Sequence, residues 1–194
     1  MQALPFEVLF LYLRMTDTEL EKLRFPIGPF NCPDQISEKH IEDWIHVLDQ
    51  FPKRLEQLVD ALNDDQLDAT YRPGGWTIRQ VIHHVADNHQ HSYIRFKWAL
   101  TEDKPTIKFY YEQDWAELAD AKFAPIALSL DHLKAVHAKL VYLLKSLSEE
   151  DLNKRFIHPE HNEEVVLKRN VGIYAWHSNH HYAHIENLMK RKGW

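Results

Sequence analysis

Histidine is the residue type that stands out in this sequence, and its neutral imidazole is the commonest metal ligand in proteins. Of 194 residues, 14 are histidine. Eight of these lie in two short segments, residues 83–91 and residues 177–184. An even spread would place about one histidine in these 17 positions. The clustering therefore needs a cause, and a metal site is the first to consider.

The second cluster has the spacing of a metal-binding pair on a helix. Residues at i and i+4 lie on one helical face, so two imidazoles with this spacing can chelate one ion. His177/His181 and His180/His184 both have it. On a helical wheel His177 and His181 lie within the apolar stripe, whereas His180 and His184 lie at its edge. A buried imidazole needs a partner, so His177 and His181 are the predicted pair.

The first cluster leaves the third ligand open. On a wheel that starts at residue 78, His89 lies at the centre of the apolar face, and His83 and His84 flank it on opposite sides. Position on the helical wheel alone favours His89 as the third ligand. A single histidine that faces the core is, however, more often a core residue hydrogen-bonded to a carbonyl. The sequence has neither the His-Glu-x-x-His pattern of metalloproteases nor a glycine-rich phosphate loop.

Four segments with helical periodicity are expected to position these histidines. Two follow the N-cap residues Ser37 and Thr77, a third runs from about Ser129 to Leu147, and a fourth from about Lys168 to Lys190. Pro52 is expected to kink the first of them. Four helices with long connections predict an all-α fold, a four-helix bundle in one domain.

The segments outside these helices lead to three further predictions. Residues 16–36 are proline-rich and are expected to form an extended arm with little regular structure. Residues 156–157 and 165–167 flank a polar turn and predict one small β-hairpin. The apolar segment Leu4–Leu13 and the aromatic stretch 109–115 add more apolar surface than a small bundle should expose, which predicts a homodimer.

Charge and composition restrict the partners and the compartment. A net charge of −6 argues against binding nucleic acid through bulk charge. No run of eighteen apolar residues exists, so neither a transmembrane helix nor a membrane partner is predicted. The single cysteine, Cys32, cannot form an internal disulfide, which fits a cytoplasmic protein.

Three segments contain patterns that rarely coincide by chance. Residues 74–87 contain W-T-x-R-Q-x-x-x-H-x-x-D, residues 92–97 read SYIRFK, and residues 176–185 contain W-H-x-x-x-H. Together they resemble the DinB-like superfamily, and within it the YfiT-type metal-dependent hydrolases. The similarity runs from about Phe25 to Trp194. It divides the chain into an N-terminal appendage, residues 1–24, and a single metal-binding helical domain, residues 25–194.

The resemblance implies a four-helix bundle that binds one divalent ion per chain through His84, His177 and His181. It therefore favours His84 over His89, which is expected to pack in the core. Asp87, one turn after His84, would orient a ligand or a water molecule. Imidazole accepts both zinc and nickel. Because ligating imidazoles must be neutral, the ion is expected to leave below about pH 6.

Three imidazole ligands leave a coordination position open, which is typical of a catalytic site. An ion there would acidify a water molecule for attack on a small substrate, as expected of a hydrolase. Two alternatives stay open. Other DinB-like members are thiol S-transferases, in which the ion would activate a low-molecular-weight thiol, and the chain could instead bind metal without catalysis. Arg79, Arg95 and Lys97 add cationic groups around the second predicted helix and are candidates to hold an anionic substrate, with ordinary surface charge as the alternative for Arg95 and Lys97.

Overall fold

The computed structural model describes residues 15–160 and 162–194. The helices and strands, in chain order, are α2 (Asp17–Arg24), α3 (Glu38–Val59), α4 (Asp64–Leu67), α5 (Ile78–Thr101), α6 (Glu112–Trp115), α7 (Ala119–Phe123), α8 (Ile126–Lys145), α9 (Glu149–Leu152), β1 (Arg155–His158), β2 (Glu163–Val166) and α10 (Leu167–Lys192). The predicted four-helix bundle is confirmed, because the four long helices α3, α5, α8 and α10 are those expected from periodicity.

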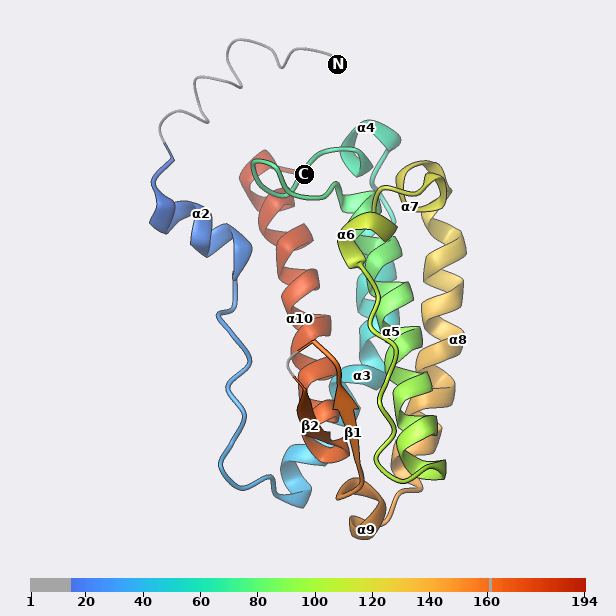
Figure 1. Ribbon diagram of the computed structural model, residues 1–194. Helices are drawn as coiled ribbons and strands as arrows, with labels where there is room; N and C mark the ends of the chain where they lie inside the picture. Colours follow the sequence, from blue (N-terminus) through green and yellow to red (C-terminus); the bar gives the residue numbers. More distant parts are fainter. Residues whose placement is uncertain (1–14, 161) are drawn as a thin grey trace.

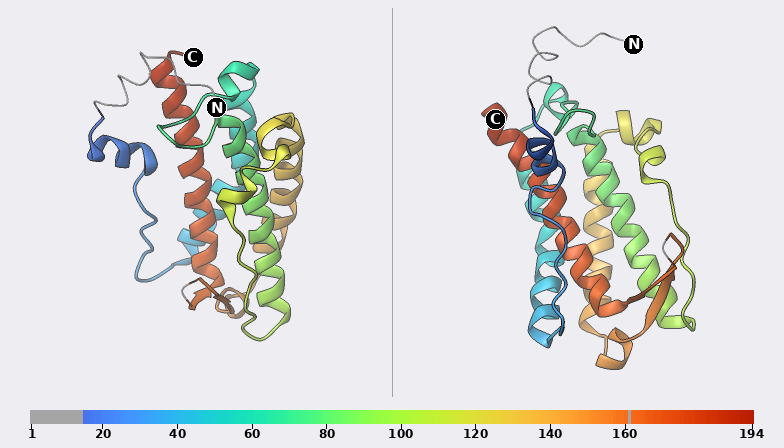
Figure 2. Two further views of the ribbon diagram at one scale, coloured as in Figure 1. Left: turned by 45° about the horizontal axis from the view of Figure 1, so that its top comes forward. Right: turned by 60° about the vertical axis from the view of Figure 1, so that its left-hand side comes forward.

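The order and direction of the long helices distinguish this bundle from a simple up-and-down one. Helix α3 packs against α10 and α8, and α5 packs against the same two helices. Figures 1 and 2 show that α5 and α8 run in the same direction, and that α3 and α10 run in the opposite one. The parallel pair requires a long return connection, and residues 102–125 supply it along the side of α5.

Capping residues place the ends of the helices that carry the histidines. Ser37 and Thr77 are the N-caps of α3 and α5, as predicted, and each takes part in a reciprocal capping box. Helix α10 ends at Gly193, whose left-handed φ of 71° suits a glycine C-cap. Helix α8 begins at Ile126, a few residues before the predicted start at Ser129.

The expectation of an arm with little regular structure over residues 16–36 is wrong in its first third. Residues Asp17–Arg24 form α2. The sequence contains the reason that this helix forms, because Thr16 and Glu19 make a capping box that closes its first turn. Helix α2 lies beside the upper half of α10, so the chain before residue 25 contacts the bundle (Figure 1).

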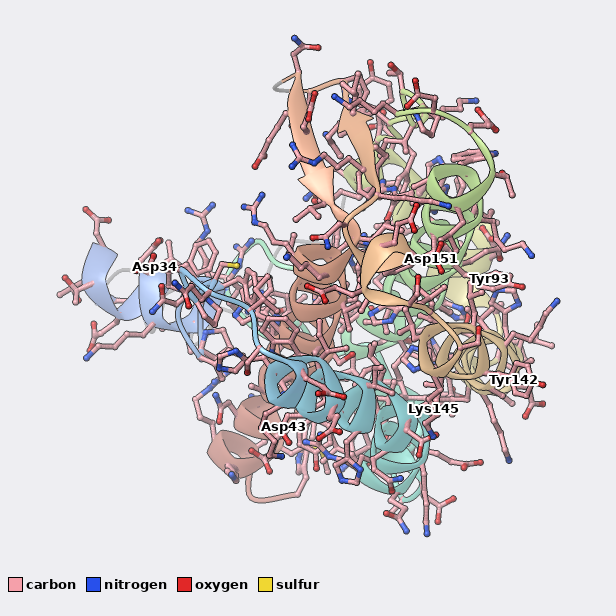
Figure 3. All side chains as sticks on the ribbon, turned by 90° about the horizontal axis from the view of Figure 1, so that it is seen from below. Asp34, Asp43, Tyr93, Tyr142, Lys145 and Asp151 are labelled. Atoms are coloured by element: carbon pink, nitrogen blue, oxygen red, sulfur yellow. The ribbon has the colours of Figure 1, made fainter. Side chains whose placement is uncertain are left out.

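The predicted β-hairpin is confirmed near the end of the bundle where α10 begins. Strands β1 and β2 pair antiparallel, with Phe156 opposite Val165. The return connection joins the hairpin through a bridge between Thr106 and Ile157. Figure 3 shows this end of the bundle from below, with charged side chains such as Asp43 of α3 and Lys145 of α8 at its rim.

The core consists of two apolar clusters with a layer of histidines between them. One cluster contains Leu48, Phe96, Leu140 and Val171, and the other contains Phe51 and Ile185 with residues from α5 and α8. His89 of α5 and His137 of α8 lie in sequence between the members of the two clusters, and they are 0% and 2% exposed.

Helix α3 continues across Pro52, which is buried inside it. Proline has no backbone N–H, so the carbonyl four residues earlier, that of Leu48, lacks the donor that a regular helix would provide. The N–H at Nδ1 of His137 donates to this carbonyl at 2.6 Å instead. Pro52 therefore creates an acceptor inside the core that a side chain from another helix uses. The kink expected at Pro52 stays a prediction.

Gly172 of α10 marks a close approach between two elements. A Cβ atom at this position would lie 2.8 Å from a ring atom of Phe30 and 2.9 Å from ring atoms of Trp44. Overpacking of this kind typically costs about 1–3 kcal/mol, and alanine recovers about 1 kcal/mol through its higher helix propensity.

We therefore expect Gly172→Ala to lower the free energy of unfolding by about 1 kcal/mol. Urea denaturation followed by circular dichroism measures it. An unchanged or higher stability would show that both rings move aside without cost.

The aromatic stretch 109–115 is less uniformly exposed than predicted. Tyr111 is 69% exposed and Trp115 39%, but Tyr110 is buried and stacks on His91. The segment Leu4–Leu13, the other basis for the predicted homodimer, lies outside the described residues. The homodimer stays a prediction.

Candidate metal centre

Three histidines from two helices converge in the upper half of the bundle. His84 lies in the second turn of α5, and His177 and His181 lie one turn apart on α10. One ring nitrogen from each lies within 4.8 Å of the others. Among the residues that the structure describes, this is the one group of three or more side chains suited to hold a metal ion.

The spacing and the surroundings of these rings fit a divalent ion. At a tetrahedral zinc ion with bonds of about 2.0–2.1 Å, two ligand nitrogens lie about 3.3–3.4 Å apart, so binding would require these ring nitrogens to move closer by up to about 1.5 Å. Within the described chain no hydrogen bond engages the ring of His84, although it is only 5% exposed. A buried imidazole without a partner is the group that an ion would satisfy.

Burial keeps all three imidazoles neutral, which is the form that binds metal. Desolvation lowers the pKa of His84 to about 3, with His180 and His184 as further causes. Desolvation and the neighbouring histidines lower the pKa values of His177 and His181 well below the ordinary value. The ligands therefore do not need to lose protons before they bind an ion at neutral pH.

His89 does not join the three converging rings, although its helical phase favoured it. It is fully buried, and its Nε2 lies 3.0 Å from Nδ1 of His177. Its Nδ1 lies 2.8 Å from Nε2 of His137. His89 is thus a core histidine hydrogen-bonded to other side chains, as expected once His84 is taken as the third ligand.

The remaining pair of α10, His180 and His184, borders the same three rings. Nδ1 of His184 lies 3.3 Å from Nδ1 of His181, and Nε2 of His184 lies 3.0 Å from the carbonyl of Arg24. His180 stacks on Trp176, and its buried Nδ1 has no hydrogen-bond partner among the described residues.

A family model described as the DinB superfamily matches residues 47–185. The chain belongs to the DinB superfamily. Two relatives illustrate the likeness. A Bacillus subtilis (strain 168) protein named "Putative metal-dependent hydrolase YfiT" is 45% identical over 172 residues, which cover 89% of this chain and 97% of that protein. A Bacillus cereus (strain 03BB102) protein named "Putative metal-dependent hydrolase" is 50% identical over 175 residues, which cover 90% of this chain and 100% of that protein.

Solved structures confirm the DinB-type bundle. YfiT from Bacillus subtilis, described as a probable metal-dependent hydrolase with an unusual four-helix bundle topology, matches with a TM-score of 0.87 and 44% identity. The match covers 89% of this chain and 99% of YfiT. TT2238, described as a four-helix bundle protein, matches with a TM-score of 0.50 and 19% identity over 77% and 98% of the two chains, which supports the fold alone.

In the structure Asp87 makes no hydrogen bond to the three histidines of this DinB chain, and its role in orienting a ligand or a water molecule stays a prediction. No hydrogen bond joins its carboxyl group to another described residue, and desolvation together with Asp120 of α7 raises its pKa to about 6. Its position on α5 is one turn after His83, which contacts Ser129 and the carbonyl of Ala124. The side chains that form hydrogen bonds with the candidate ligands are His89, which contacts His177, and His184, which contacts His181.

A cavity of about 270 Å³ opens onto the three histidines. Tyr71, Trp76 and Trp176 contribute aromatic walls, and Arg72 contributes a cationic group. A larger groove of about 760 Å³ lies at the opposite end of the DinB bundle, between α3 and the end of α8. Among the described residues no three metal-ligating side chains gather in that groove, so the chemistry is assigned to the smaller cavity.

The arginines considered as substrate-binding groups have structural partners. Arg79 pairs with Asp64 and Asp68 and links the start of α5 to α4. Arg95 is buried and donates to the hydroxyl of Tyr174. The cavity of this DinB chain takes its cations from Arg72 and Arg24, which the sequence analysis missed because neither lies in a histidine-rich segment.

None of the helices formed by the described residues combines the length and the apolar character needed to cross a membrane.

Proposed function

We propose that this chain is a metal-dependent hydrolase of a small substrate, and that His84, His177 and His181 hold one zinc or nickel ion. The observation that carries the proposal is the convergence of three neutral imidazoles at the floor of a cavity. The names of the relatives support it. When bound, an ion with three protein ligands supplies a Lewis acid and lowers the pKa of a water molecule.

The residues around the ligands define what the cavity would accept. Its volume of about 270 Å³ is at the lower limit of ordinary ligand pockets, which favours a small substrate. Trp76 and Trp176 would pack against apolar parts, and Arg72 would bind a carboxylate or another polar oxygen. His180, which stacks on Trp176, also lines the cavity.

A proton acceptor is also present at the cavity. Glu112, the first residue of α6, lines it, and desolvation together with Glu160 raises the pKa of its carboxyl group. A raised pKa brings a carboxylate closer to the range in which a general base works at neutral pH. Glu112 is therefore the residue of this chain that we assign to proton transfer.

The test is a measurement of metal content and turnover on protein purified without a histidine tag. We expect about one divalent ion per chain by elemental analysis, and hydrolysis of small esters, amides or phosphoesters that stops on chelation and returns with zinc or nickel. Glu112→Gln should retain the metal and lower turnover by about 10²–10⁴-fold.

Three results would contradict the proposed hydrolase. Consumption of a thiol together with an electrophile, without hydrolysis, would identify a thiol S-transferase. An absence of turnover in fully loaded protein would identify a metal-binding protein without catalysis. A metal content near zero after addition of zinc and of nickel would reject the site itself.

We also propose that the protein works in the cytoplasm, since Cys32 is its single cysteine and has no internal partner for a disulfide.

A further inference from the structure

We infer that two chains of hydrogen-bonded histidines, each ending on a backbone carbonyl, orient two of the three metal ligands. In this assignment His137, His89 and His184 are positioning residues for His177 and His181. The inference rests on the proposed metal site, but it concerns protons and hydrogen bonds that exist in the protein without metal.

The first chain begins at the carbonyl of Leu48, which Pro52 leaves without a helical donor. A carbonyl only accepts, so the 2.6 Å contact places the proton of His137 on Nδ1. Nε2 of His137 must then accept from Nδ1 of His89. Nε2 of His89 in turn accepts from Nδ1 of His177, and this sequence leaves Nε2 of His177 with a free lone pair.

The second chain begins at the carbonyl of Arg24, at the end of α2. Nε2 of His184 donates to this carbonyl at 3.0 Å, so Nδ1 of His184 has a lone pair. That lone pair accepts from Nδ1 of His181 at 3.3 Å. Nε2 of His181 is therefore also free. Both chains require neutral rings, and burial of His89, His137, His181 and His184 disfavours the charged form.

The two chains select the same tautomer for both ligands, with the proton on Nδ1 and Nε2 free for an ion. Hydrogen bonding to the far nitrogen fixes the orientation of a ligand ring and raises its basicity. The first chain passes through all four long helices, from α3 through α8 and α5 to α10. The position of His177 is thereby linked to the packing of the whole bundle.

The first experiment reads the tautomers directly in metal-free protein. Long-range ¹H–¹⁵N correlation spectra at pH 7.5 assign the protonated nitrogen of each ring. We expect Nδ1–H for His137, His89, His177 and His181, and Nε2–H for His184. Observation of Nε2–H for His177 would overturn the inference for the first chain of histidines, and Nε2–H for His181 would overturn it for the second.

The second experiment measures zinc affinity by competition with a chromophoric chelator. His137→Leu removes both hydrogen bonds of His137, and we expect zinc affinity to fall about 10–100-fold. His137→Gln keeps an N–H for the Leu48 carbonyl and an oxygen for His89, so it should recover most of the affinity. His184→Leu and His184→Gln form the same pair for the second chain.

Leu133→Ala is the control, since Leu133 is fully buried one turn before His137 and lies outside both chains. We expect this variant to lose stability and to keep its zinc affinity. An affinity in His137→Leu equal to that of the parent would overturn the positioning role. Should His137→Leu fail to fold, the glutamine variant and the tautomers of the parent still decide the question.

These experiments distinguish a failure of the proposed function from a failure of the positioning inference. If the tautomers are as expected but the parent binds neither zinc nor nickel, the two histidine chains stand as hydrogen-bond networks and the hydrolase proposal fails. If the parent binds one ion and a ligand carries its proton on Nε2, the site stands and the positioning inference fails.

Discussion

Metal content should fall from about one ion per chain to near zero when His177 and His181 are both replaced by alanine. The two residues supply two of three converging nitrogens, and a single imidazole from His84 cannot chelate. Hydrolytic turnover should be lost with the metal. Elemental analysis after gel filtration, together with turnover at saturating substrate, measures both effects.

The matched control is the double variant His46→Ala/His132→Ala, which removes two exposed histidines from α3 and α8. It should keep the metal content and the turnover of the parent. A metal content near one in the His177/His181 variant would contradict the assigned ligands. His84→Gln separates the third ligand from His89, because it should lose the metal while His89 stays in its buried hydrogen bonds.

Mild acid should unfold the metal-free protein. Burial lowers the pKa values of nine histidines in the described chain: His83, His84, His89, His91, His137, His177, His180, His181 and His184. In the unfolded chain these rings take up protons near pH 6.5. The unfolded state therefore binds more protons below that pH, and the free energy of unfolding falls as the pH falls.

The free energy of unfolding falls by about 1.4 kcal/mol per pH unit for each additional proton that the unfolded state binds. Even four such histidines would remove about 5–6 kcal/mol per unit, which is comparable to the whole stability of a typical domain. We expect a cooperative loss of helical circular dichroism near pH 5 without metal. His137→Leu should make the pH dependence shallower by about one proton. A metal-free bundle that stays folded at pH 4 would contradict this expectation.

The same argument changes the expected pH of metal release. An ordinary histidine pKa predicts release below about pH 6 by direct protonation of the ligands. The pKa of His84 in the fold is about 3, so the ligands resist protonation as long as the bundle stays folded. Metal and helical structure should therefore be lost together, and added zinc should move the unfolding midpoint to lower pH.

Periodicity and capping were sufficient to predict the four helices and the pair His177/His181, because both depend on residues close together in the sequence. The shared direction of α5 and α8 was not predicted, since it depends on how residues 102–125 cross the bundle. Helix α2 was missed although its capping box at Thr16 and Glu19 is visible in the sequence.

The choice between His84 and His89 shows where helical phase stops being informative. A wheel gives the direction toward the centre of the bundle, and His89 points there. The cavity lies to one side of the centre, so the residue at its floor is His84, at the edge of the apolar face. The contacts of His137 with His89 and Leu48 cross three helices, and no pattern within one segment contains them.

The histidine layer between the two apolar clusters also determines how this bundle would change under selection for heat resistance alone. Replacing one member of a buried hydrogen-bonded pair leaves its partner unsatisfied, whereas replacing both by apolar groups of similar shape is close to neutral or stabilising. His89 and His137 are not an isolated pair, because hydrocarbon side chains at both positions would leave the carbonyl of Leu48 and Nδ1 of His177 without partners. Selection by melting temperature alone would therefore have to replace His89, His137 and His177 together and to supply the carbonyl of Leu48 with another donor. A descendant chosen in this way would keep the bundle and lose a candidate metal ligand.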